Sequence, residues 1–309
     1  MSNLFQKTIL KKAEFKGVGL HHGLKSIIKI IPADENYGIL FKRIDLEKNN
    51  IIKANFENVS STKLCTTIQN NFNVSISTVE HLLAALYMTG IDNALIEINS
   101  PEVPIMDGSS KEFVETILKI GVKEQKVKRK YLKIIKKFEF KENEKFISIE
   151  PNNNSLNVDF QLIYSNNVIG NQRNQINFSD KDLTNVYTSR TFCLFEDVEK
   201  IKKIGLAKGG SLDNAIVVDN EKVLNKEGLR NNKEFVNHKI LDLAGDFILS
   251  GYRILGKVSC YRGGHQLSNL FLRELLENNK KNFEIVELET EQKTQISQKN
   301  YSTRLVVNG

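Results

Sequence analysis

The sequence predicts an α+β protein made of two domains with related construction. An early strand, turn and strand pattern, SIIKIIP, ADEN and YGILFKR, returns later in the chain as FISIEP, NNNS and LNVDFQLIY. Each half then runs to one strong helix followed by a strand. Between the halves, apolar periodicity lapses in the basic run after Gly121. We therefore expect an N-terminal α+β domain over residues 1–126 and a C-terminal α+β domain over residues 127–309.

The first half opens with two strands, Lys25 to Ile31 and Tyr37 to Arg43, which the turn PADEN should join as a hairpin. The segment GVGLHHG precedes them, and its glycines permit tight turns. His21 and His22 are therefore expected on a connection between strands. The glycine spacing is not that of the dinucleotide-binding GxGxxG motif, and no βαβ unit follows it.

The next segment, STVEHLLAALYMTG, has signals for a helix at both ends. Ser77 and Glu80 match a capping box, and Gly90 suits the C-terminal cap. The capping box offers Glu80 a purely structural role. His81, one of only five histidines, adjoins that carboxylate near the start of the helix.

The most informative stretch is EFVNHKILDLAGDFILSG, Glu234 to Gly251. Its apolar residues spread around most of a helical wheel, which is typical of a helix buried on nearly all sides. His238, Asp242 and Asp246 follow one another at intervals of four residues, so they project from one strip. Unpaired carboxylates there would be costly to bury, and a divalent metal would supply the missing charge.

The rest of the second half adds a strand and an inserted segment. YRILGKVSCY predicts a strand, and the following RGGHQLSN places His265 on a glycine-flanked loop free to approach a site. The inserted segment runs from TSRTFCLFEDV through GLAKGGSLDNAIVV to LNKEGL. It contains neither a phosphate-binding GxxxxGK[ST] loop nor a complete nucleophile elbow.

Composition limits the class of protein. The net charge is +7, but the lysines are scattered apart from the run KEQKVKRKYLKIIKK, and no nucleic-acid recognition motif accompanies them. We therefore expect no nucleic-acid partner. No apolar run reaches the roughly 20 residues of a membrane span, and the N-terminus lacks a secretory signal, which predicts a cytoplasmic protein without a transmembrane segment. The three cysteines occur in no CxxC pair and are expected to be reduced thiols.

Together the candidate residues predict a zinc hydrolase. His81, His238 and Asp242 would bind the metal and leave a fourth position for water. Glu80 would take the proton of that water as general base. His265 would donate a proton to the leaving group, held in its protonated state by the charge of Asp246.

Several motifs together carry a resemblance to a known family. GVGLHHG, STVEHLLAAL, PEVPIMDGSS, SRTF, LAKGGSLDNAIVV, NHKILDLAGD and GGH occur in order from Gly17 to His265. In this combination they resemble UDP-3-O-acyl-N-acetylglucosamine deacetylase, the zinc enzyme of lipid A biosynthesis in Gram-negative bacteria. The resemblance implies two similar domains packed as a β-α-α-β sandwich, with the zinc site at the domain junction. It implies hydrolysis of the N-acetyl group of an acylated UDP-amino-sugar, with release of acetate, by a protein that we expect to be a monomer.

Carried over residue by residue, the resemblance gives His81, His238 and Asp242 as zinc ligands and Glu80, His265 and Asp246 as the base, the acid and its orienting carboxylate. It adds Thr191, whose hydroxyl helps to hold the oxyanion. It also implies a set of substrate-binding residues, several of them in the insert that would form the acyl-chain passage: Leu20, Phe192, Gly210, Ser211, Ala215, Val217, Lys239 and Arg262. For the passage, an ordinary core strand remains the alternative.

Two residues depart from the family pattern. His22 replaces a small hydroxyl residue and Arg262 replaces a lysine, which changes the geometry offered to a diphosphate. Cys65 lies in a segment that approaches the site in the family, which leads to the hypothesis that excess zinc binds there and inhibits.

The metal and the substrate class have alternatives. Iron can occupy the ligand set His81, His238 and Asp242 as well as zinc. The alternatives are a zinc amidase or peptidase with another substrate and, less favoured, a basic nucleic-acid-binding protein.

Overall fold

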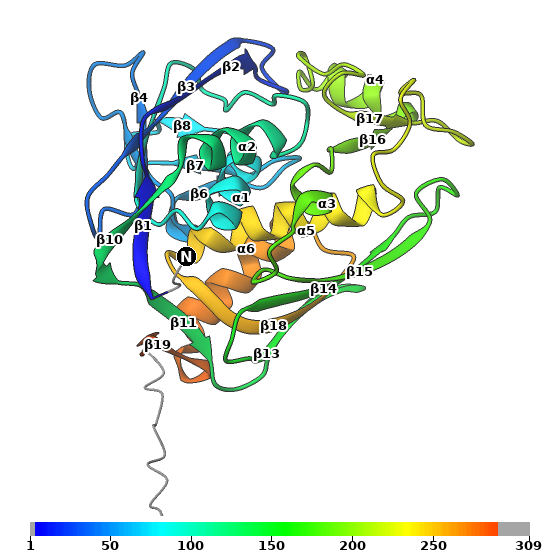
Figure 1. Cartoon of the computed structure of the whole chain (residues 1–309). Coiled ribbons are helices and arrows are strands. Elements are labelled where there is room, and N and C mark those ends of the chain that lie inside the picture. The colour runs from blue at the N-terminus through cyan, green and yellow to red at the C-terminus, as the bar shows by residue number, and fades with distance from the viewer. Residues whose placement is uncertain (1–3, 290–309) are drawn as a thin grey trace, which may run out of the picture.

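The computed structural model describes residues 4–289, in which two large sheets enclose layers of helices and three smaller sheets lie beside them. In Figure 1 one sheet lies at the upper left and the other at the bottom, and the helices fill the space between them. The order of layers is therefore sheet, helices, helices, sheet. The predicted α+β sandwich is confirmed. Residues 1–3 and 290–309, the outer ends of the two predicted domains, lie outside the described residues.

The N-terminal sheet has five strands in the order β2 (Ala13–Val18), β3 (Lys25–Pro32), β9 (Ala94–Ile98), β4 (Ile39–Arg43) and β5 (Ile51–Lys53). Both predicted strands of the early pattern exist, but the predicted hairpin is wrong. Strand β9 lies between them, antiparallel to β3 and parallel to β4. Its alternate residues Ala94, Ile96 and Ile98 are fully buried. The apolar β9 gains a partner on both edges and a buried face by taking this central place.

The C-terminal sheet repeats this arrangement. Strand β18 (Arg253–Tyr261) lies between β13 (Lys145–Pro151) and β14 (Leu156–Ile163), antiparallel to the first and parallel to the second. In both halves, therefore, the strand that follows the strong helix enters between the first two strands of the pattern. The expected similarity of the two domains is seen in the pairing itself. The remaining strands of this sheet are β11 (Lys130–Ile134), β12 (Phe138–Glu142), β15 (Asn171–Asn177) and β19 (Phe283–Glu287).

Four helices make up the middle layers: α1 (Glu80–Thr89), α2 (Lys111–Ile120), α5 (Glu234–Phe247) and α6 (His265–Arg273). Helix α5 is buried nearly all round, as predicted. Its Gly245 lies against the start of α1, where an added Cβ would be only 2.1 Å from the carbonyl oxygen of Glu80. This close approach brings the polar residues of the two helices together.

The predicted capping box of α1 is wrong. The helix begins at Glu80, with Val79 at the N-cap and no side-chain capping bond. Glu80 instead accepts a hydrogen bond from the backbone N–H of Thr66, because the tertiary contact offers its carboxylate a buried donor. The predicted C-terminal cap is confirmed, since Gly90 adopts the left-handed conformation at φ 79°.

The insert projects from the body at the upper right of Figure 1. It contains β16 (Phe192–Leu194), α4 (Phe195–Lys203) and β17 (Ile216–Val218), with β16 and β17 paired in parallel. Strand β1 (Phe5–Ile9) pairs with β10 (Val122–Lys128), so the boundary predicted between residues 126 and 127 falls inside β10 and stays a prediction. The other elements are β6 (Val59–Ser61), β7 (Thr67–Gln69), β8 (Ser75–Ile76), α3 (Thr184–Tyr187), the 3-10 turns η1 (Phe56–Asn58), η2 (Ile248–Ser250) and η4 (Lys280–Asn282), and the π-helical turn η3 (Glu274–Asn278).

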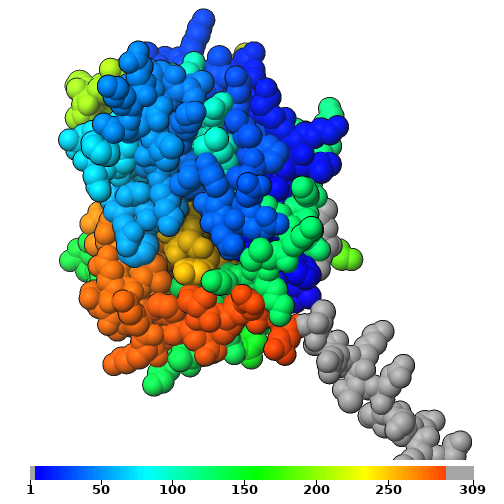
Figure 2. Space-filling model, turned by 90° about the vertical axis from the view of Figure 1, so that its left-hand side faces the viewer, coloured from blue at the N-terminus to red at the C-terminus, as the bar shows by residue number. Residues whose placement is uncertain are grey.

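The junction of the two halves is open at one side of the molecule. Figure 2 shows that side, where the chain after α5 lies in a hollow between the N-terminal half and the C-terminal segments. A cavity of about 350 Å³ occurs at this junction, lined by Tyr37, Arg129, Tyr252 and Arg253 among others. Within residues 4–289, none of the helices combines the length and the apolar character that crossing a bilayer requires.

Candidate metal centre and catalytic site

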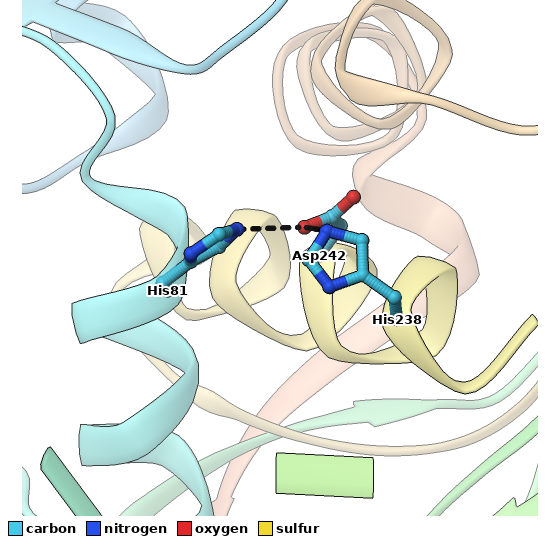
Figure 3. Close-up of side chains that lie close together, drawn as sticks. All are labelled: His81, His238 and Asp242. Atoms are coloured by element: carbon cyan, nitrogen blue, oxygen red, sulfur yellow. Dashed lines mark ion pairs between the residues drawn. The ribbon is translucent and has the colours of Figure 1, made fainter. Parts of the chain in front are cut away.

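His81, His238 and Asp242 converge between helices α1 and α5 (Figure 3). Asp242 Oδ1 lies 3.3 Å from His238 Nε2 and 3.6 Å from His81 Nε2. One ligand atom from each of the three residues lies within 4.8 Å of the others, and all three residues are buried. The i, i+4 spacing aligns His238 with Asp242 on α5, and the close helix contact at Gly245 brings α1 with His81 beside them.

The chemistry of these three residues fits a divalent cation. Asp242 Oδ1 is buried, and no described residue forms a hydrogen bond with it. The Nδ1 of His238 donates to the carbonyl oxygen of Ser189 at 3.1 Å, which leaves Nε2 free to bind a metal. Burial lowers the pKa of His238 to about 3, so its imidazole is neutral as a ligand must be. Two nitrogens and one carboxylate oxygen form a ligand set typical of catalytic zinc.

The Asp242 carboxylate is held in its charged form. Burial alone would raise its pKa, but its pairing with His238 and the positive charges of Lys239 and His265 lower it well below the usual value. The Nζ of Lys239 lies 2.9 Å from Asp242 Oδ2. Asp242 also raises the pKa of Lys239 against the opposing effect of burial. A permanent cation therefore lies on the far side of the metal-binding carboxylate.

Three carboxylates surround His265. Its Nδ1 is 3.0 Å from Asp246 Oδ2, and its Nε2 is 3.6 Å from Glu80 Oε1 and 4.0 Å from Asp242 Oδ2. Burial alone would lower its pKa, but Asp246 and Glu80 raise it to about 10. Burial also raises the pKa of Glu80, although His265 and His81 oppose this. The site thus pairs an imidazolium with a carboxylate made more basic by its surroundings.

The predicted loop position of His265 is wrong. His265 is the first residue of α6, with Gly264 at the N-cap in extended conformation at φ −178°. The following residues bury Leu267, Phe271 and Leu272 on one face of this helix. This amphipathic pattern extends the helix back to His265, so the imidazole is held by a regular element.

Phe192 and Thr191 are two further predicted site residues. The ring of Phe192 lies 6.3 Å from the ring of His238 and 5.7 Å from Lys239 Nζ, measured to its centroid. Thr191 is fixed by its backbone, since its N–H donates to Gly108 O at 2.8 Å and its carbonyl accepts from Ile216. The oxyanion-binding role of the Thr191 hydroxyl stays a prediction.

The other predicted substrate-binding residues lie farther along the insert or across the site. Gly209 N–H donates to the carbonyl of Leu20 at 3.0 Å, and an added Cβ on Gly210 would be 3.5 Å from a methyl group of Leu20. Leu20 therefore contacts the insert. Ser211 is exposed, Ala215 is buried just before β17 and Val217 is half-buried in that strand, whereas Arg262 pairs with Glu144. Their binding roles stay predictions.

His22, which departs from the family pattern, and Cys65 each lie next to a buried carboxylate. His22 Nδ1 lies 2.9 Å from Glu102 Oε2, and Glu102 also accepts from the backbone N–H of both His21 and His22. Cys65 is buried, and burial together with the charge of Glu80 raises the pKa of its thiol to about 12. The hypothesis that excess zinc binds at Cys65 stays a prediction.

Sequence reasoning missed two groups that hold the site together. Thr66 contacts both Glu80 and Asp246, and the carbonyl of Ser189 orients His238. Next to Ser189, the fully buried Arg190 pairs with the fully buried Glu234 at 2.9 Å. Neither threonine nor a backbone carbonyl leaves a local sequence signal for such a role, because the partner is more than 10 residues away.

Comparison with known proteins gives one consistent result. A family model described as UDP-3-O-acyl N-acetylglycosamine deacetylase (LpxC) matches residues 6–277. A Haemophilus ducreyi protein is 42% identical over 276 residues, with 88% of this chain and 90% of the relative covered. A Legionella pneumophila protein is 43% identical over 274 residues, with the same shares covered. A Shewanella violacea protein is 40% identical over 297 residues, with 95% and 96% covered. All three relatives bear the name UDP-3-O-acyl-N-acetylglucosamine deacetylase.

Proposed function

The chain belongs to the UDP-3-O-acyl-N-acetylglucosamine deacetylase family, and on this premise we propose that it hydrolyses the N-acetyl group of UDP-3-O-acyl-N-acetylglucosamine, releasing acetate, in lipid A biosynthesis. The observation that carries the proposal is the position of Asp242 Oδ1 between two imidazole nitrogens, with Glu80 and His265 beside them. No specific observation favours the alternative of a zinc amidase or peptidase acting on another substrate.

His81, His238 and Asp242 would hold zinc in this function. Zinc in a three-ligand site of this kind brings the pKa of water to about 7 and polarises a carbonyl oxygen. A nitrogen, nitrogen and oxygen ligand set also accepts iron, and we propose zinc because of the family membership.

Glu80 acts as general base in the proposed mechanism. One of its oxygens, Oε2, is engaged by Thr66, and Oε1 faces the centre of the site, where it accepts the proton of the attacking water. Its raised pKa suits this role, because proton transfer is most effective when the pKa of the base lies near the working pH. The hydroxyl of Thr191 donates a hydrogen bond to the oxyanion that forms from the acetamide carbonyl.

His265 acts as general acid. Its Nδ1 is held by Asp246, so Nε2 presents the proton to the nitrogen of the breaking amide bond. With a pKa of about 10, the imidazole carries that proton at neutral pH. The amine of the sugar and acetate then leave as separate products. Glu80 and His265 thus share the acid and base work as two groups.

Substrate binding uses the groups around this centre. Lys239 carries a positive charge next to the ligands. Phe192 lies in the insert, which takes the acyl chain through Phe192, Gly210, Ser211, Ala215 and Val217 together with Leu20. Arg262 contributes charge for the diphosphate. All three cysteines are free, which supports the cytoplasm as the compartment, and we propose a monomer.

The substitution Glu80→Gln tests the mechanism. It keeps the shape and the hydrogen-bonding capacity towards Thr66 but removes the base, so we expect acetate release from acylated UDP-N-acetylglucosamine to fall by about 10²- to 10⁴-fold. Zinc content should be unchanged, since Glu80 is not a ligand. Glu97→Gln is the matched control. Glu97 lies in β9 and forms an ion pair with Lys42, away from the site, so this variant should keep full turnover. Full turnover by Glu80→Gln would refute the assignment of the base.

A further inference from the structure

Thr66, the residue before strand β7, links the two carboxylates on either side of His265. Its N–H donates to Glu80 Oε2 at 3.0 Å, and its hydroxyl donates to Asp246 Oδ1 at 2.7 Å. Thr66 is only 1% exposed. Both hydrogen bonds go to carboxylates and are shielded from water, which makes them strong and directional.

These two bonds decide which oxygen of each carboxylate faces the imidazole. The Thr66 hydroxyl is hydrogen-bonded to Asp246 Oδ1, which leaves Asp246 Oδ2 to face His265 Nδ1 at 3.0 Å. The Thr66 N–H is hydrogen-bonded to Glu80 Oε2, which leaves Glu80 Oε1 to face His265 Nε2 at 3.6 Å. Thr66, Asp246, His265 and Glu80 therefore form a closed ring of polar contacts. A carboxylate that lost its outer partner would be free to rotate, and the imidazole would lose its fixed direction.

The two links of Thr66 differ in how they respond to mutation. The bond to Glu80 comes from the backbone, as does the bond that the Thr66 carbonyl accepts from Val79 N–H at 3.3 Å. Both survive replacement of the side chain. Only the bond to Asp246 depends on the hydroxyl, so a substitution at position 66 isolates the link through Asp246 to His265.

We propose that Thr66 is a positioning residue that acts through Asp246 to aim Nε2 of His265 at the leaving nitrogen, an inference that rests on the proposed deacetylation. It places in the acid–base system a residue that does not itself touch the substrate. A purely structural hydroxyl would affect only folding, because it would do no more than satisfy a buried carboxylate oxygen.

The first test compares Thr66→Val with Thr66→Ser. Valine keeps the branched shape but removes the donor, and we expect kcat for acetate release to fall on the order of 10- to 100-fold. The KM should change by no more than about twofold, and zinc content should be unchanged, because the loss lies in the chemical step. Serine keeps the hydroxyl and should retain kcat within about threefold. Thr66→Ala replaces the valine variant in every comparison if valine prevents folding.

Thr8→Val is the matched control. Thr8 is 3% exposed, and its hydroxyl donates to the Asn93 carbonyl at 2.7 Å, so the same substitution removes an equally buried bond of the same length, together with the bond that this hydroxyl accepts from Ala33 N–H at 3.0 Å. We expect this variant to lose stability but to keep kcat. An equal fall in kcat for Thr8→Val and Thr66→Val would overturn the positioning role.

A double-mutant cycle decides whether Thr66 acts through Asp246. In the Asp246→Asn background, we expect Thr66→Val to lower kcat by no more than about twofold further, since the link it breaks is already altered. An equal loss in both backgrounds would overturn the inference, as would a Thr66→Ser variant as impaired as Thr66→Val. If the wild-type protein is active and the Thr66→Val variant is equally active, the positioning role is refuted but the proposed function is not. A wild-type protein that releases no acetate refutes the proposed function and this inference together.

Discussion

Replacing Gly245 by alanine would test whether the close approach of two helices assembles the metal centre. An added Cβ would lie 2.1 Å from the carbonyl oxygen and 2.8 Å from the carbonyl carbon of Glu80, whereas ordinary contact begins at 3.4 Å. The obstructing atoms are backbone, so α1 and α5 would have to separate by about 1 Å. That movement would carry His81, on α1, away from His238 and Asp242, on α5.

Two effects on stability oppose each other in this variant. Alanine in a helix is more favourable than glycine by about 1 kcal/mol. Overpacking of a core costs about 1–3 kcal/mol, and backbone overlap belongs at the upper end of that range. We therefore expect a net destabilisation of about 2 kcal/mol. A displacement of about 1 Å between reacting groups can cost on the order of 10²-fold in rate, so turnover should fall by about that factor.

Urea unfolding, zinc content and acetate release measure these effects. Gly264→Ala is the control for stability, because an added Cβ there would meet no atom within 4 Å and its backbone is extended. We expect the control to change the free energy of unfolding by no more than about 1 kcal/mol. If Gly245→Ala were as stable as the wild type and kept its zinc and its turnover, the helix contact would not position the site.

Three further outcomes are expected. Removal of metal by a chelator should abolish acetate release and lower the thermal midpoint, because a ligand bound only by the folded state stabilises it, and zinc should restore both; full activity of metal-free protein would contradict the metal role. Burial raises the pKa of Cys260 from 9.0 to about 12, so this thiol should react with iodoacetamide far more slowly in native than in unfolded protein at pH 8. The stability that comes from keeping this thiol protonated is fully present below about pH 9 and is lost as the pH rises towards 12, which urea unfolding across that pH range would detect. Equal labelling of native and unfolded protein would refute the burial of Cys260.

Much of the candidate site could be predicted because its key spacings are local. The interval of four residues between His238 and Asp242 sets their alignment wherever that segment is helical, and its apolar residues require the helix to be buried. Residue chemistry and the family resemblance together predict the pairing of His81 with this helix. The structure then brings these three residues together.

The sequence by itself determined the main elements and the residue types that can bind a metal, because helix and strand periodicity depend on neighbours along the chain. Only the tertiary structure decided that β9 and β18 enter between earlier strands, that His265 begins a helix and that Thr66, rather than a capping box, engages Glu80. These features depend on contacts between segments far apart in sequence. A buried carboxylate takes whichever donor the packing brings to it, and no local pattern records which donor that will be.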